Sequence, residues 1–182
     1  MAVKKGEIGI DLGTGVQAKV EAGMLIVKGP KGEVKRNVSH PRLDVEVTEG
    51  KVKVSSEGKS LSEKRLCCTY RAHVRNMVKG VKEGHEYLIK ICSSHFPMNV
   101  SISNGQLVVK NFLGEKHPRK LELSKEVDVK VNGDTIVVTC PDKEMAGTVA
   151  SRIEGLMRRP GFDPRIFQDG CYIMSKSGKE LK

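Results

Sequence analysis

The sequence reads Gly23-Met24-Leu25-Ile26-Val27-Lys28, with Gly32-Glu33 after it, and 82 residues further on it reads Gly105-Gln106-Leu107-Val108-Val109-Lys110, with Gly114-Glu115 after it. Two further pairs of segments match at an offset of 84 residues: 44–47 with 128–131, and 52–54 with 136–138. A nearly constant offset of this length indicates a duplicated domain and not a short solenoid repeat.

In each copy a set of strands precedes one helix. Apolar and polar residues alternate in the strand segments, which is the period of a half-buried strand. In the first copy Ser60-x-x-Glu63 forms a capping-box pattern ahead of a helical apolar stripe. The second helix is expected to begin near Asp142 and to end at Pro160, because proline cannot continue a helix.

These patterns predict an α+β protein with two tandem duplicated domains, residues 1–82 and 83–182. Each domain is expected to be an antiparallel sheet packed against one helix. The second domain includes the tail that follows its helix. At under about 90 residues a copy, each core is small.

The composition favours an anionic partner. The chain has 182 residues with 32 Lys and Arg against 22 Asp and Glu, a formal charge of +10. Such an excess suits nucleic acid or a membrane surface. No apolar run is long enough to cross a bilayer and no signal-peptide pattern is present, so we expect an intracellular protein that does not bind membranes.

The five cysteines are scattered, and none forms a C-x-x-C pair. This pattern predicts neither a metal site nor a redox motif, and we expect no cofactor. Cys67 and Cys68 are neighbours, but a small buried apolar side chain on a helix explains such a residue better than a metal ligand does. The use of free thiols fits a reducing compartment.

One stretch resembles the phosphate-binding turn of the actin and heat-shock-seventy ATPases, Gly9-Ile10-Asp11-Leu12-Gly13-Thr14-Gly15. Those ATPases need two large lobes and a second phosphate loop, which this sequence lacks. We interpret the stretch as an N-terminal strand and a glycine turn. The five histidines lie far apart, and no common catalytic motif occurs. We therefore expect neither an enzyme nor a small-molecule substrate.

The stretch after the second helix, residues 158–176, interleaves Arg and Lys with Phe and Tyr. The whole chain has four Phe, three Tyr and no Trp, so three aromatics here are a concentration. Guanidinium groups neutralise phosphates and aromatic faces stack on unpaired bases, which together favour RNA binding. The alternative is that these aromatics pack the tail onto the domain.

Four blocks of sequence carry a family resemblance. The C-terminal block is Arg165-x-Phe167-x-Asp169-Gly170-x-Tyr172, followed by Lys176. The other blocks are His95-Phe96-Pro97-Met98-Asn99-Val100 with Asn111-Phe112-Leu113-Gly114-Glu115-Lys116 and Arg119, Val27-Lys28-Gly29-Pro30-Lys31-Gly32, and Val74-Arg75-Asn76-Met77-Val78-Lys79-Gly80-Val81. Through these four blocks the chain resembles the universal large-subunit ribosomal protein six family, which is protein nine in eukaryotic counting. The resemblance is to the eukaryotic and archaeal branch of this family.

The resemblance implies a structural constituent of the large ribosomal subunit, located in the cytoplasm and supporting translation. It implies contact with rRNA near the sarcin–ricin loop and the stalk base, and with neighbouring large-subunit proteins. A free-standing RNA-binding or regulatory module with the same fold is the alternative. The resemblance puts much of the rRNA contact on the C-terminal domain and tail, where we expect RNA binding by Lys110, Asn111, Lys116, Arg119, Lys120, Arg158, Arg159, Arg165, Phe167, Tyr172 and Lys176.

Charge is unevenly divided, since residues 1–82 carry a balance of +8 and residues 83–182 only +2. The basic residues of the second half are therefore expected to cluster, because phosphate contacts act within about a Debye length. The acidic residues expected on the opposite side are Glu122, Glu126, Asp128, Asp134, Asp142 and Glu144.

Three local expectations concern the backbone near the site. Asp169-Gly170 is expected to form a tight turn in which the Asp accepts bonds from backbone N–H groups. Cys171 stands where the family usually has a branched aliphatic residue, a mild change if the side chain is buried. His117-Pro118 interrupts a region that the family continues as a strand, because proline lacks the ladder N–H.

Overall fold

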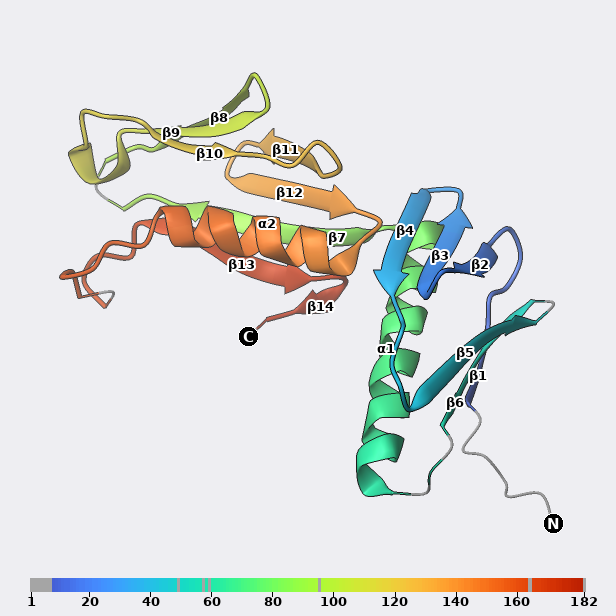
Figure 1. The fold of residues 1–182 in the computed structure, drawn as a ribbon. Helices are drawn as coiled ribbons and strands as arrows, with labels where there is room; N and C mark the ends of the chain where they lie inside the picture. The colour runs from blue at the N-terminus through green and yellow to red at the C-terminus, as the bar shows by residue number, and fades with distance from the viewer. Residues whose placement is uncertain are drawn as a thin grey trace, which may run out of the picture. The chain divides into compact units, whose positions relative to one another are not determined.

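The structure, a computed structural model, describes residues 8–48, 50–56, 58, 60–94, 96–163 and 165–181. Glu49 of an expected turn, His95 of a family block and Pro164 of the tail lie outside the described residues. The chain divides into two compact units, Met1–Gly84 and His85–Lys182 (Figure 1).

The strands of the N-terminal unit form two antiparallel sheets, with the orders β1-β6-β5 and β2-β3-β4. Tight turns join neighbouring strands, and Gly23 between β2 and β3 has a φ of 77°, which residues with a Cβ rarely adopt. The described elements are β1 (Ile8–Asp11), β2 (Gln17–Glu21), β3 (Met24–Gly29), β4 (Gly32–Asn37), β5 (Leu43–Thr48), β6 (Lys51–Ser56) and α1 (Leu61–Glu83).

Helix α1 begins where the capping box predicted it. The Ser60 side chain accepts a bond from the backbone N–H of Glu63, and the Glu63 carboxylate accepts one from the Ser60 backbone N–H. The helix contacts strands of both sheets. Its buried side chains, such as Val74 and Val81, pack in one core with Leu25 of β3.

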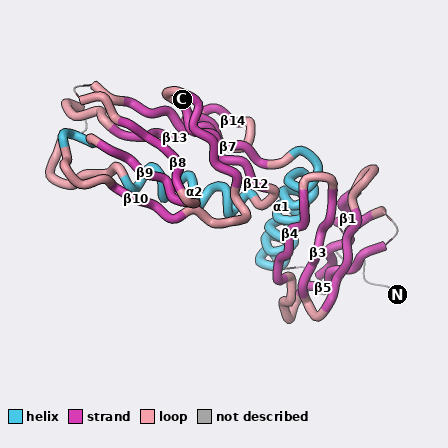
Figure 2. Tube along the Cα trace, turned by 90° about the horizontal axis from the view of Figure 1, so that it is seen from above, coloured by secondary structure: helices cyan, strands magenta, loops and turns pink. Residues whose placement is uncertain are grey.

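The C-terminal unit repeats this order of elements and then adds a hairpin. Its sheets have the orders β11-β12-β7-β13-β14 and β10-β9-β8, and Figure 2 shows the same strands in a second view. The described elements are β7 (His85–Cys92), β8 (Asn99–Ser103), β9 (Gln106–Lys110), the 3-10 turn η1 (Phe112–Gly114), β10 (Arg119–Glu122), β11 (Asp128–Asn132), β12 (Thr135–Cys140), α2 (Lys143–Leu156), β13 (Gly170–Lys176) and β14 (Lys179–Glu180).

The pairing of strands is the same in the two units. The sheet β1-β6-β5 corresponds to β7-β12-β11, and β2-β3-β4 corresponds to β8-β9-β10. The predicted α+β fold with two duplicated domains is therefore confirmed. Each unit divides its described strands between two sheets, and in the C-terminal unit β13 pairs with the edge of β7 that β12 leaves open.

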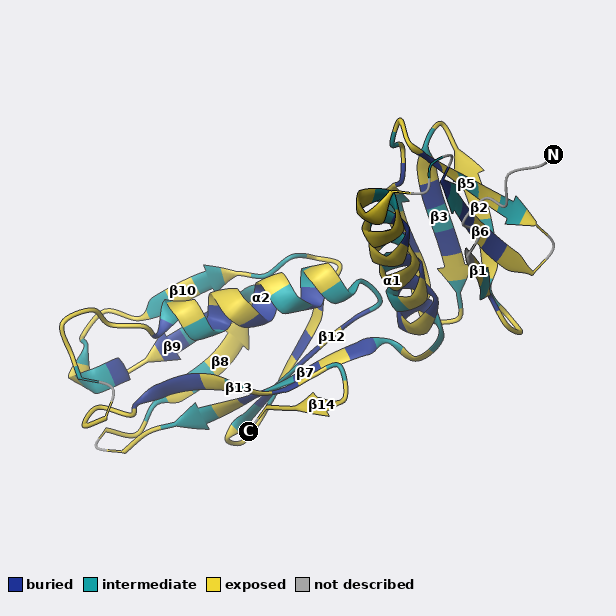
Figure 3. Cartoon of the chain, turned by 90° about the horizontal axis from the view of Figure 1, so that it is seen from below, coloured by how far each residue is buried: buried dark blue, intermediate teal, exposed yellow. Residues whose placement is uncertain are grey.

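Helix α2 lies across β12, β7 and β13 and also contacts β10 (Figures 1 and 3). Asp142 caps its first turn by accepting a bond from the backbone N–H of Glu144. Its buried face includes Val149 and Ile153. The prediction that Pro160 ends the helix was wrong, because α2 already ends at Leu156.

Pro118 does not interrupt the strand that follows it. Strand β10 begins one residue later, at Arg119, and pairs with β9 only. A proline just before an edge strand costs no ladder hydrogen bond. No helix in the described part of the chain is long and apolar enough to span a membrane.

Candidate nucleic-acid interface

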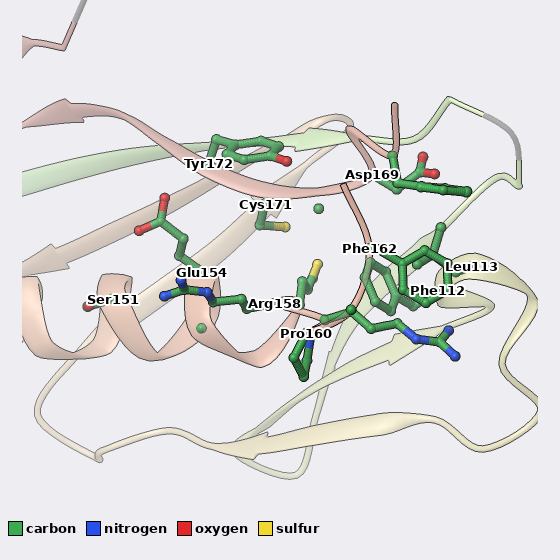
Figure 4. A pocket seen from close by; sticks show the side chains of 16 residues that line it. Phe112, Leu113, Ser151, Glu154, Arg158, Pro160, Phe162, Asp169, Cys171 and Tyr172 are labelled. Carbon is green, nitrogen blue, oxygen red and sulfur yellow. The ribbon is translucent and has the colours of Figure 1, made fainter. Parts of the chain in front are cut away.

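The segment between α2 and β13 borders a pocket of about 600 Å³ at the C-terminal end of α2. The η1 turn forms another part of its wall. Cys171 and Tyr172 are neighbours on β13, so their side chains lie on opposite faces of the strand. Of the two, only Cys171 points toward α2 in Figure 4. The lining combines aromatic, cationic and acidic side chains: Phe112, Phe162, Phe167, Tyr172, Arg158, Arg159, Glu154 and Asp169.

Three of the lining aromatics keep a large part of their surface in solvent. The exposed fractions are 38% for Phe162, 43% for Phe167 and 40% for Tyr172. The Phe162 and Phe167 rings meet edge to face, with centroids 4.8 Å apart at 79°. Phe112 is buried and belongs to the core. A group of exposed aromatic rings at one pocket is the arrangement that stacking on bases requires.

Arg158 and Arg159 line the pocket with these rings, and Arg165 belongs to the same segment of chain. The guanidinium of Arg159 lies 4.5 Å from the Phe162 ring centre, and its Nη1 is 3.6 Å from a carboxylate oxygen of Glu115. Arg158 is exposed. Arg165 is also exposed but forms a bidentate pair with Asp163, and the hydrogen bonds from Arg165 lower the pKa of the Asp163 carboxyl.

Arg119 has intramolecular partners for most of its donors. Its Nε and Nη2 donate to the two carboxylate oxygens of Glu115 at 2.8 and 2.7 Å. Its Nη1 donates to the carbonyl of Leu156, the last residue of α2, and its guanidinium lies 4.4 Å from the Phe112 ring centre. These hydrogen bonds lower the pKa of Glu115. The position of Arg119 is therefore explained by the fold, and its contact with RNA stays a prediction.

The match to a known protein family has two parts, one in each of the two repeats. The model of the family described as Ribosomal protein L6 matches residues 12–84 and 96–170. The chain belongs to the ribosomal protein L6 family. Membership of this family, whose proteins are structural components, confirms the prediction that the chain is not an enzyme.

Archaeal relatives place the chain in the expected branch of the L6 family. It is similar to the large ribosomal subunit protein uL6 of Methanosarcina mazei, with 41% identity over 168 residues, 92% of this chain and 96% of the relative. It is 38% identical to that of Methanococcus vannielii over 94% of each chain. It is 36% identical to that of Methanothrix thermoacetophila, over 92% of this chain and 95% of the relative.

Several predicted RNA-binding residues of this L6-family chain gather beside η1. Lys110 ends β9, and Lys116 lies between η1 and β10, both exposed. Asn111 has a left-handed backbone with a φ of 60°, and its side-chain amide donates to the Pro97 carbonyl at 3.1 Å. Lys120 is exposed on β10. The local turn explains Asn111, while the three lysines present charge to solvent.

Lys176 lies away from the pocket. It pairs with Tyr87 and Lys179 at the end of β13, whereas the strand enters from the pocket at Gly170. Six residues of extended chain separate the two ends by roughly 20 Å. The structure therefore does not bring Lys176 to the other predicted residues.

The predicted separation of charge exists along α2 but is incomplete. Asp142 and Glu144 lie at the start of the 14-residue helix. Arg158 and Arg159 follow its end, roughly 20 Å away at the helical rise. Acidic groups that were not expected, Glu115, Glu154, Asp163 and Asp169, also lie at the basic end.

Asp169 anchors the tail and does not form the predicted tight turn, because Gly170 already begins β13. The Asp169 carboxylate, largely buried, accepts bonds from the backbone N–H and the hydroxyl of Ser94. Capping of a backbone N–H was expected, but the partner lies after β7 and not in the tail itself. This contact fixes the entrance of β13 beside the pocket.

Cys171 fills the core under the pocket. It is buried, and burial raises the pKa of its thiol to about 12. A thiol in this state packs like a small aliphatic group, which fits the change from the family's usual residue. In the part of the chain that the structure describes, no three His, Cys, Asp or Glu side chains are grouped to hold a metal ion.

Proposed function

We propose that the chain is a structural component of the large ribosomal subunit and binds large-subunit rRNA through the pocket at the C-terminal end of α2. The observation that carries this proposal is that half-exposed aromatics and exposed arginines line one pocket, Phe162, Phe167 and Tyr172 with Arg158 and Arg159. Membership of the L6 family supports it.

Two kinds of contact are proposed for the two kinds of side chain. The arginines neutralise phosphates, and the aromatic rings stack on bases that are not paired in the rRNA. Stacking on one aromatic side chain contributes about 1–3 kcal/mol per base. The pocket thus recognises a loop or bulge and not a regular helix, whose bases are already stacked.

The rRNA region that we propose is the one that the family resemblance implies, beside the sarcin–ricin loop and the stalk base. Neighbouring large-subunit proteins are the other expected partners, and the location is the ribosome in the cytoplasm. Neither a cofactor nor a small-molecule substrate enters this proposal.

Sedimentation of a native lysate through a sucrose gradient at moderate and high salt tests the proposal. We expect the protein to migrate with the large subunit at both salt concentrations, because stacking survives when phosphate contacts are screened. A Phe167→Ala/Tyr172→Ala variant should be released at high salt, whereas Ile102→Ala, which removes an equally exposed apolar side chain on β8, should not. Protein found only at the top of the gradient would support the free-standing RNA-binding module instead.

A further inference from the structure

The outer face of α1 carries a row of cations in the N-terminal unit. All five exposed basic residues of this helix lie on it, whereas the only exposed acidic residue of the helix is Glu83 in its last turn. A spacing of seven residues from Lys64 to Arg71, followed by two spacings of four to Arg75 and Lys79, brings them to one side of the helix, with Arg65 beside Lys64. The row consists of Lys64, Arg65, Arg71, Arg75 and Lys79, and we call it the α1 basic row.

The duplicated domain supplies an internal control for this row. Helix α2 follows the corresponding strands in its own unit and packs on β12, β7 and β10, the counterparts of β6, β1 and β4, and also on β13. Its exposed charged residues are only Glu144 and Arg152, which balance each other. Packing a helix on this fold therefore does not require a basic outer face, and the α1 basic row needs another explanation.

The fold does not use these five charges. Among the described residues, no ion pair involves the α1 basic row. Lys28, Lys35 and Lys51 elsewhere in the same unit each pair with a carboxylate. Unpaired like charges four residues apart, as in Arg71, Arg75 and Lys79, destabilise a helix, so an external anion would relieve the repulsion.

The length and composition of the row indicate which kind of anion it can bind. From Lys64 to Lys79 it extends over 15 residues, roughly 22 Å at the helical rise. No exposed aromatic side chain lies on α1, in contrast to the pocket of the C-terminal unit. A linear row of cations without stacking groups matches the phosphate backbone of a double helix and offers nothing to an unpaired base.

We propose that the α1 basic row binds the backbone of a double-helical RNA segment, as a second RNA site separate from the pocket. The inference deepens the proposed function, because it assumes that the chain works among RNA helices. The two sites differ in the contacts that they offer to RNA, since the α1 basic row of the N-terminal unit contributes charge and the pocket of the C-terminal unit contributes stacking. Binding at the row is independent of base sequence.

Fluorescence anisotropy of the full chain with a blunt 20-base-pair RNA duplex tests the proposal. The variant Arg71→Gln/Arg75→Gln/Lys79→Gln removes three charges and keeps good helix formers. Each lost phosphate contact should lower the slope of log affinity against log salt by about 1, so we expect a reduction of about 3. Lys19→Gln/Lys53→Gln/Lys125→Gln removes the same charge from exposed positions off the row and should leave most of the slope intact.

A second pair of variants keeps the test decisive if the first one folds poorly. Lys64→Gln/Arg65→Gln changes the other end of the row and should lower the slope by about 2. Phe162→Ala/Phe167→Ala/Tyr172→Ala should lose binding to a single-stranded loop RNA while it keeps binding to the duplex. Failure of this last variant to weaken loop binding would count against the pocket alone, not against the α1 basic row.

Two results would overturn the inference. Equal losses of duplex binding in the row variant and its charge-matched control would mean that only net charge matters. Unchanged duplex binding, together with reduced occupancy of the row variant on large subunits, would assign the row to an acidic protein partner instead of RNA.

Discussion

Replacing Arg119 by Met should release the C-terminal end of α2 from η1. The change removes a bond to the Leu156 carbonyl, two bonds to Glu115 and the contact with Phe112, while it keeps an apolar stem. A hydrogen bond from a charged group contributes about 1.5–3 kcal/mol, a partly exposed ion pair up to about 1, and a cation–π contact about 0.5–1. Because these contributions are not additive, we expect a loss of about 2–3 kcal/mol in the free energy of unfolding of the C-terminal unit.

Thermal unfolding followed by circular dichroism measures this loss. For a unit of this size, each kcal/mol lowers Tm by about 4–8 °C, so the transition of the C-terminal unit should fall by roughly 10–20 °C. Hydrogen exchange should show the increase in opening at the last turn of α2 first. The matched control is Arg152→Met on the exposed face of α2, which should change stability by less than about 0.5 kcal/mol.

The stability difference between wild type and Arg119→Met depends on pH, and the direction of this dependence follows from the pKa of Glu115. Hydrogen bonds from Arg119 lower the pKa of folded Glu115 below its ordinary value of 4.5. As the pH falls, the unfolded chain therefore takes up a proton at Glu115 before the folded chain does. The contribution of the Glu115–Arg119 pair to stability is present above pH 4.5 and disappears as the pH falls through the folded pKa of Glu115. The stability difference between wild type and Arg119→Met should shrink between pH 7 and pH 3. A difference that stays constant, or an Arg119→Met variant as stable as Arg152→Met, would refute the reasoning.

Three further expectations concern the cap of α1, the core of the C-terminal unit and the reactivity of the cysteines. Ser60→Ala should cost the N-terminal unit about 1 kcal/mol, seen as a lower midpoint in denaturant, because it removes the capping box of α1. Ile153→Ala should cost the C-terminal unit about 2–5 kcal/mol by the same measurement, since this fully buried side chain leaves a cavity. In the folded protein at pH 8, iodoacetamide should modify exposed Cys68 and spare Cys171, whose buried thiol has a pKa of about 12, and mass spectrometry of the labelled peptides checks this.

Local patterns predicted much of the fold. The Ser60–Glu63 capping box predicted the start of α1, and the repeat at residues 23–28 and 105–110 indicated the duplication in which β3 and β9 correspond. The division of each unit into two sheets was not predictable in this way. It depends on pairings such as β1 with β6, which join strands far apart in the chain and leave no local signal.

The composition of the tail indicated candidate residues but not their arrangement. Phe167, Tyr172 and Arg158 of this tail border one pocket, and their contact with RNA stays a prediction. The end of α2 was misjudged, and the last helical carbonyl, that of Leu156, bonds to Arg119 from 37 residues away. The distance of Lys176 from the pocket follows from the direction of β13 along β7, which sequence alone does not reveal.

Ultraviolet crosslinking of large subunits that contain this chain, followed by mass spectrometry of nucleotide-linked peptides, tests the proposed rRNA contact most directly. Aromatic side chains stacked on bases crosslink efficiently, so we expect linked nucleotides on Phe162, Phe167 or Tyr172. The linked nucleotides should lie in an unpaired segment of the rRNA. Crosslinks found on other parts of the chain, with none on the peptides that contain these three aromatics, would contradict the assignment of the pocket to RNA.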